Sequence, residues 1–136
     1  MPFPEVRDWA SVRITLRRTA CLVGCPEYQV QIDGSGDALF TGTYPVQGER
    51  RRHVSREALE GLLEVFRKAN YFSLDREYKV EATDWPTYIT SVSIDGRAMS
   101  VTDYGGLQAG MPVSVQDVED AIDDVAGTRV WLKPGR

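Results

Sequence analysis

Two cysteines separated by three residues are the first feature that could carry chemistry. Cys21 and Cys25 are followed by Pro26, which disfavours a helix at Cys25. Thiols at this spacing come within disulfide range if the backbone reverses between them. A redox role needs one thiol with a lowered pKa, and a zinc site needs carboxylate ligands because the chain has only two cysteines and one histidine. We favour packing or a structural disulfide, with redox chemistry and metal ligation as open alternatives.

Two aspartates beside a predicted hairpin are the second feature. Asp84 belongs to the run Thr83–Thr87, which includes Trp85, and Asp103 belongs to Thr102–Tyr104. Two carboxylates act as acid and base when their surroundings separate their pKa values. A hydrolase that uses Asp84 or Asp103 is therefore one hypothesis. Aspartate and threonine before a strand more commonly bond local amides and shape a turn, and we favour that role.

Three other segments have weaker claims to chemistry. His53 could act as a base for a cysteine only if the fold brought the two together, so we expect a surface or packing role. Glu49–His53 contains three arginines, whose side chains would alternate between the faces of a strand, and we expect a solvated edge. Gly105–Gly110 lies between a strand and a helix, as phosphate loops do, but it lacks the G-x-x-x-x-G-K-[ST] sequence. We expect it to be a connector.

The elements that position these residues follow from hydrophobic periodicity. Apolar and polar residues alternate from Val12, which predicts half-buried strands. Asp33–Gly36 and Asp95-Gly96 are typical of hairpin turns. The predicted strands are residues 12–17, 28–32, 38–44, 88–94 and 97–104, with 50–53 as a brief edge strand.

Two helices complete the predicted pattern. Ser55 is a good N-cap for a helix whose apolar stripe is Leu59, Leu62, Leu63, Phe66 and Ala69. Ser114 is expected to cap a second helix that ends at Gly127, and Asp75–Pro86 is expected to be a polar connection. The order strand-strand-strand-helix-strand-strand-helix predicts an α+β fold, with an antiparallel sheet of about five strands and two helices packed on one face.

Composition limits the function further. The 136 residues are enough for one domain, 1–136, that folds without a metal or disulfide. The formal net charge of −4 weakens the case for binding phosphate backbones or anionic membranes. The chain has no run of about 18 apolar residues and no signal-peptide pattern at its start, so we expect a cytoplasmic protein. We expect no cofactor and no metal.

The chain resembles the bacterial domain-of-unknown-function family 6438 over residues 12–132. The resemblance is carried by ordered motifs: ITLRRT at 14–19, Cys21-x-x-x-Cys25-Pro26-x-Tyr28, DGSG at 33–36, ANYFSL at 69–74, TD-x-PT at 83–87, VTDY at 101–104, VEDAI at 118–122 and AGT at 126–128. It implies no catalytic residues. It does imply that the family pattern includes Cys21, Cys25, Pro26, Tyr28, Asp84, Pro86, Asp103 and Tyr104. The pattern has a glycine at or near position 23, whereas this chain has Val23 followed by Gly24.

These observations predict a non-enzymatic binding or interaction module. The partner is expected to be a protein or a small molecule rather than nucleic acid. The expected binding surface comprises Tyr28, Asp84, Trp85, Asp103 and Tyr104. The alternative is a thiol-dependent module, redox-active or switched by a disulfide between Cys21 and Cys25.

Overall fold

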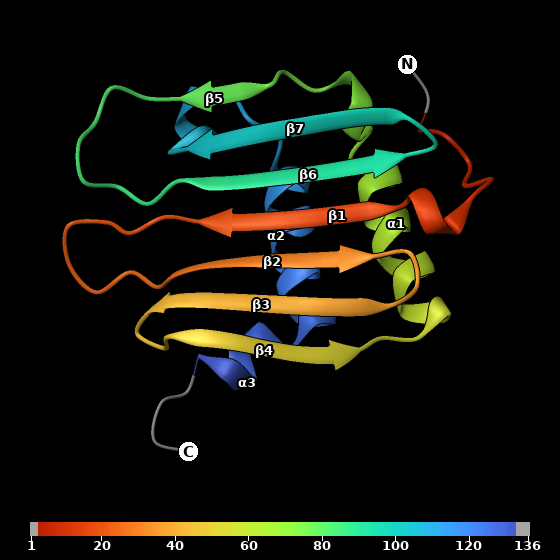
Figure 1. Ribbon diagram of the computed structural model, residues 1–136. Helices are drawn as coiled ribbons and strands as arrows, with labels where there is room; N and C mark the ends of the chain where they lie inside the picture. Colours follow the sequence, from red (N-terminus) through yellow and green to blue (C-terminus); the bar gives the residue numbers. More distant parts are fainter. Residues whose placement is uncertain (1–2, 133–136) are drawn as a thin grey trace.

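The computed structural model describes residues 3–132, and within them seven strands form one mixed sheet (Figure 1). The order of the strands across the sheet is β4-β3-β2-β1-β6-β7-β5. The strands are β1 (Arg13–Arg18), β2 (Glu27–Asp33), β3 (Asp37–Tyr44), β4 (Gly48–His53), β5 (Glu77–Lys79), β6 (Tyr88–Ile94) and β7 (Arg97–Tyr104).

Both predicted hairpins are present. In the first, β2 pairs with β3 so that Val30 lies opposite Phe40, and in the second, β6 pairs with β7 so that Val92 lies opposite Met99. All four of these side chains are buried. Strand β1 joins the hairpins by pairing antiparallel with β2 on one side and β6 on the other.

The predicted sheet was wrong in two respects. It has seven strands in the described residues rather than about five, because Gly48–His53 forms a full edge strand and Glu77–Lys79 adds another. It is also mixed, since β5 pairs parallel with β7. Strand β5 lies inside the segment expected to be a polar connection. Its three residues are too few to produce a readable alternation, and only pairing with β7 defines it as a strand.

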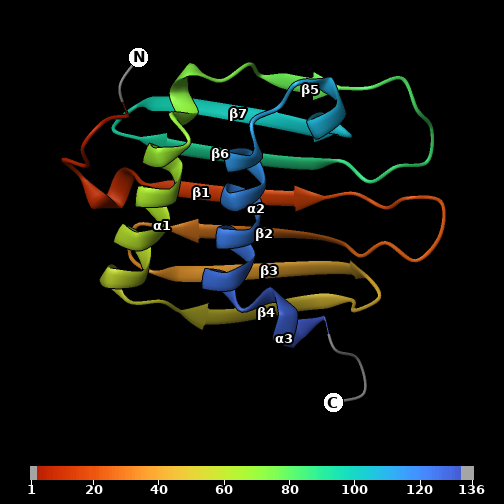
Figure 2. The same cartoon turned by 180° about the vertical axis from the view of Figure 1, so that it is seen from behind.

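The helices lie on one face of the sheet and run across the strands, as Figure 2 shows. They are α1 (Arg56–Lys68), α2 (Val113–Ala126) and the short α3 (Thr128–Trp131). Ser55 caps α1 as predicted, because its Oγ accepts a hydrogen bond from the Ala58 N–H at 3.1 Å. The predicted Ser114 cap was wrong: α2 begins at Val113, and the residue before it, Pro112, offers no side-chain bond.

The core fills the space between the sheet and the two long helices. The apolar stripe of α1 packs there, and Tyr71 places its hydroxyl 2.7 Å from Thr90 Oγ1, which satisfies both buried groups. At the edge, Trp131 of α3 contacts the Phe40 ring with centroids 5.4 Å apart. In the described residues, no helix covers the opposite face of the sheet, and its side chains are mostly polar, as in the Thr15–Ser91 hydroxyl pair.

Two glycines make a matched stability test. A Cβ at Gly34 would lie 1.6 Å from the carbonyl oxygen of Trp9, whereas a Cβ at Gly61 in α1 would meet nothing within 4 Å. We expect Gly34→Ala to lower the free energy of unfolding by about 2 kcal/mol or more, since the backbone must shift. Gly61→Ala should raise it by up to about 1 kcal/mol, since alanine is the better helix former. Urea unfolding measures both, and equal effects of the two substitutions would contradict the packing described.

Candidate functional site

Three loops meet at one end of the sheet, where β1 and β7 end and β2 and β6 begin (left side of Figure 1). They are residues 19–26, 80–87 and 105–110, and we call this region the loop end. The backbone N–H of Leu22 donates to the Asp84 carbonyl at 3.0 Å, and the N–H of Thr19 donates to the Thr87 carbonyl at 2.9 Å. The loop containing the cysteines is therefore docked on the loop that precedes β6.

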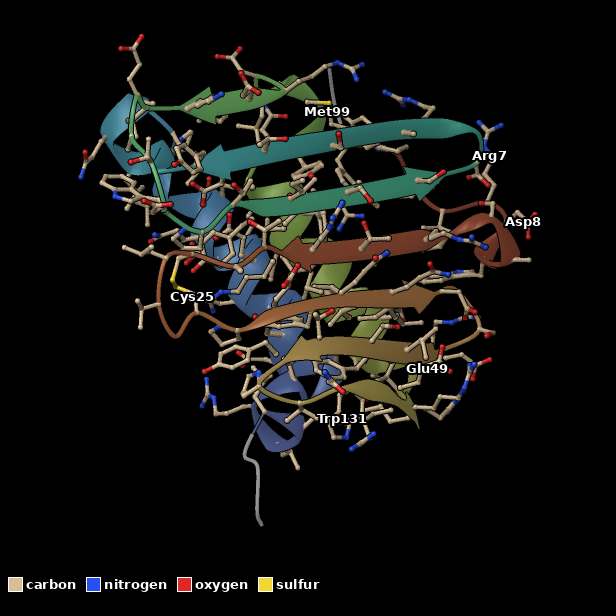
Figure 3. All side chains as sticks on the ribbon, turned by 60° about the vertical axis from the view of Figure 1, so that its left-hand side comes forward. Arg7, Asp8, Cys25, Glu49, Met99 and Trp131 are labelled. Carbon is tan, nitrogen blue, oxygen red and sulfur yellow. A yellow bond between two sulfur atoms is a disulfide. The ribbon has the colours of Figure 1, made fainter. Side chains whose placement is uncertain are left out.

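A disulfide closes the first of these loops. Cys21 and Cys25 are bonded, with their Cα atoms 5.4 Å apart. Figure 3 shows the bond beside Cys25 at the outer edge of the loop. A disulfide between these cysteines is therefore present, and it is compatible with both the structural interpretation that we favoured and the redox alternative. While they are bonded to each other, the two sulfur atoms are not available as thiolate ligands for a metal ion.

Trp85 of the second loop packs on Tyr104, the last residue of β7 before the third loop. The centroids of the two rings lie 6.2 Å apart, and the Tyr104 hydroxyl donates to the Ala82 carbonyl at 2.8 Å. The indole also lies against Gly105, where a Cβ would come within 2.5 Å of it. Glycine at 105 therefore lets the tryptophan pack on the backbone of the third loop.

The loop end gathers exposed apolar side chains. Leu22 and Val23 are 73% and 81% exposed, and Trp85 is 39% exposed. Leu107 and Tyr44 are also exposed, on the third loop and at the end of β3. Of the seven large hydrophobic residues exposed in the described part of the chain, five therefore lie at this end of the sheet. Such clustering of apolar surface marks interaction sites in soluble folds.

Beneath the loop end, the helix-facing side of the sheet changes from apolar to polar in its last row. Strand register places Tyr28, Arg18, Tyr88, Asp103 and Tyr78 side by side across β2, β1, β6, β7 and β5. We call these five residues the polar row. The Arg18 guanidinium lies 4.8 Å from the centre of the Tyr88 ring.

Helix α2 covers the polar row with two carboxyl groups. Glu119 is only 7% exposed, and burial raises its pKa to about 10, with further contributions from a hydrogen bond to Asp103 and the charge of that residue. Glu119 therefore keeps its proton at neutral pH and is the donor in its hydrogen bond to Asp103, while its Oε2 has no hydrogen-bond partner. Asp103 in turn accepts a hydrogen bond from the Gly106 N–H at 2.8 Å.

The second carboxyl group from α2 is that of Asp123. Its two oxygens accept the Tyr28 hydroxyl, each at 2.9 Å. Burial raises the pKa of Tyr28, and the neighbouring Asp123 charge raises it further, so the phenol remains a donor. Burial also raises the pKa of Asp123 above its usual range.

The residues proposed for chemistry are only partly brought together. Asp103 is buried beside Glu119, whereas Asp84 lies exposed on its loop at a positive φ of 65°. His53 lies at the other end of the sheet from the cysteines, opposite Asp37 in the register of β3 and β4. Within residues 3–132, no group of three or more His, Cys, Asp or Glu side chains is placed to hold a metal ion.

Three residues of this site were not predicted from the sequence. Arg18 follows Val12, Ile14 and Leu16 at period two, so the alternation already placed it on the buried face. Glu119 lies four residues after Val115 and three before Ile122, within the apolar stripe of α2. Asp123 follows Glu119 by one turn. In each case the periodicity indicated the buried position, but no role was assigned to the charged residue there.

The fold is thus of the α+β class, with two helices on one face of a mixed sheet. Residues 12–126 match the family model described as Domain of unknown function (DUF6438), and the chain belongs to that family. No curated protein matches the chain. Within the described residues, no helix is both long enough and apolar enough to span a membrane.

Ionisation of Glu119 predicts a pH dependence of stability. Its folded-state pKa of about 10 lies above the ordinary 4.5, so between these values the folded chain keeps a proton that the unfolded chain has released. Stability therefore falls as pH rises, by at most about 1.4 kcal/mol per pH unit. We expect Glu119→Gln to remove this slope and to be more stable than the wild type at pH ~9, since the amide does not titrate.

Urea unfolding of both proteins across the neutral to alkaline range measures this effect. Asp117→Asn, an exposed position on the same helix, is the matched control and should follow the wild type. Parallel stability curves for the wild type and Glu119→Gln would contradict a buried, protonated Glu119.

Proposed function

We propose that this protein is a non-enzymatic interaction module whose loop end binds a protein partner. The observation that carries the proposal is the group of exposed apolar side chains there, led by Leu22, Val23 and Trp85. A disulfide and loop-to-loop hydrogen bonds hold these side chains in place. Binding to a surface that is already ordered loses little conformational entropy.

The five residues expected to form the binding surface divide into two groups in this proposal. Asp84 and Trp85 lie on the second loop and Tyr104 ends β7, and these three residues would contact the partner directly. Tyr28 and Asp103 are buried in the polar row, so they would support the surface without touching the partner. The region 12–132 would act as one unit.

Two features favour a protein partner over the other classes considered. The arginines of β4 form an exposed edge strand, whereas the loop end presents aromatic and aliphatic groups beside Asp84. Nucleic acid binding requires a concentrated basic surface. A hydrolase that pairs Asp84 with Asp103 is disfavoured because the buried partner of Asp103 is Glu119.

Truncating Trp85 tests this proposal. A photo-crosslinking side chain at Val23 should capture a partner in cells, and the same side chain at Val130, which is exposed on α3, should not. The captured protein, once purified, should bind Trp85→Ser at least about tenfold more weakly than the wild type. Val130→Ser is the matched control and should bind normally. Equal capture from both positions, or full affinity of Trp85→Ser, would refute the proposed surface.

A second candidate function is a thiol switch at the same surface, and the position of the disulfide in the loop end favours it. Two glutathione molecules would each give up one electron and one proton, forming glutathione disulfide while Cys21 and Cys25 become thiols. The cytoplasm keeps most thiols reduced, and we place the protein there in this second proposal. Reduction of the disulfide would open the closed segment 21–25, so Leu22 and Val23 would no longer be held by it.

A glutathione titration separates the two functions. For a switch, Cys21 and Cys25 should be half-reduced within the cytosolic range of glutathione potentials, as read by alkylation and mass spectrometry. The double variant Cys21→Ser, Cys25→Ser should lose about 2 kcal/mol of stability, as expected for so short a closed loop, and should bind the partner like the reduced protein. A disulfide that stays intact throughout that range would eliminate the switch and leave the interaction module.

A further inference from the structure

A cavity of about 320 Å³ opens beside the polar row, between the end of the sheet and the segment joining α2 to α3. Its lining includes Arg18, Tyr28, Asp120, Asp123 and Thr128. We call it the Arg18 cavity. Its volume is near the lower limit for small-molecule sites, so it suits a ligand of few atoms. It is distinct from the apolar surface of the loop end and does not depend on the function proposed above.

Two buried polar groups that line this cavity lack hydrogen-bond partners. The Nε of Arg18 is buried and makes no hydrogen bond. The hydroxyl of Thr128, a residue only 1% exposed, makes none of ordinary geometry, although it lies near Asp123. Buried polar atoms are nearly always paired, so the Arg18 Nε indicates a ligand that supplies the missing partner, while Asp123 is the neighbour nearest to pairing with the Thr128 hydroxyl.

The charge of Arg18 is also unpaired. Among the described residues, no carboxylate lies within ion-pair distance of its guanidinium. The guanidinium rests on the Tyr88 ring and lies near the Tyr28 hydroxyl, and neither neutralises it. A guanidinium without an ion-pair partner is suited to a ligand carboxylate, because its planar group can bind the carboxylate with two parallel hydrogen bonds.

The wall of the Arg18 cavity formed by α2 and α3 carries three aspartates, Asp120, Asp123 and Asp124, and one arginine, Arg129, which pairs with Asp124 at 3.6 Å. Asp123 is held in place by the Tyr28 hydroxyl, and Asp120 lies exposed at the opening. These carboxylates would repel a simple anion, and Arg18 would repel a simple cation. A ligand with one negative and one positive group can place the negative group against Arg18 and the positive group against the aspartates.

We propose that the Arg18 cavity binds a small zwitterion of the α-amino-acid type. Its carboxylate lies against Arg18 and Thr128, and its ammonium group lies against Asp123 and Asp120. An α-amino acid carries both charged groups on one carbon, so a single cavity of about 320 Å³ can hold both.

Calorimetry with the purified full chain tests this inference, using the standard amino acids one at a time as probes. At least one should bind, and acetate, methylamine and inorganic phosphate should each bind at least about tenfold more weakly, because each satisfies only one wall. Arg18→Gln should weaken amino-acid binding by about tenfold to a hundredfold, the range for a charged hydrogen bond. Arg17→Gln is the matched control: it is the adjacent arginine of β1, faces the other side of the sheet, and should not change binding.

A second variant keeps the test decisive if Arg18→Gln fails to fold. Asp120→Asn changes an exposed residue of the opening and should also weaken amino-acid binding, whereas Asp117→Asn, exposed on the same helix, should not. Failure of every amino acid to bind, or acetate or phosphate binding as tightly as the best amino acid, would overturn the proposal. Unchanged affinity in both Arg18→Gln and Asp120→Asn would do the same.

Discussion

The structure depends on the burial of one face of a wide sheet beneath two helices. Alternation along β1, β2 and β6 gives each strand an apolar side, and the antiparallel register aligns those sides into one surface. Helices α1 and α2 cover that surface, while the other face stays polar. A shift of one residue in any pairing would expose the core face of that strand to water, so the hydrophobic pattern itself specifies the register.

The same register explains why a polar row exists at all. Position 18 continues the buried side of β1, and the residues opposite it on β2 and β6 are Tyr28 and Tyr88. A charged residue there cannot turn to the solvated face without breaking the strand. Arg18 is accommodated instead by the Tyr88 ring, and Glu119 is accommodated by taking up a proton. Burial of charge at this end is therefore a consequence of the strand pairing and of where α2 crosses it.

Local signals in the sequence were enough for most of the fold. Asp95-Gly96 specifies a tight turn, and the Ser55 cap with its apolar stripe specifies α1, so these elements depend on neighbours in the chain. What could not be predicted depends on distant contacts. Strand β5 exists because β7 pairs with it. The meeting of Asp103 with Glu119, rather than with Asp84, depends on the crossing of α2 over the sheet. The Cys21–Cys25 disulfide was one of several alternatives because spacing alone does not establish a backbone reversal.

The buried carboxyl pair and the loop end are physically connected through Asp103. One of its oxygens holds the Gly106 N–H, and Gly106 begins the turn that follows Gly105, on which Trp85 packs. Asp103 also accepts a hydrogen bond from the protonated Glu119. Ionisation of Glu119 would place a second negative charge beside Asp103 in the interior, and the resulting repulsion would drive the two carboxylates apart. Because Asp103 accepts the Gly106 N–H, that movement would displace the Gly106 backbone and the adjacent Gly105, on which Trp85 packs. The protonated state of Glu119 thus stabilises the shape of the surface on which the proposed interaction depends.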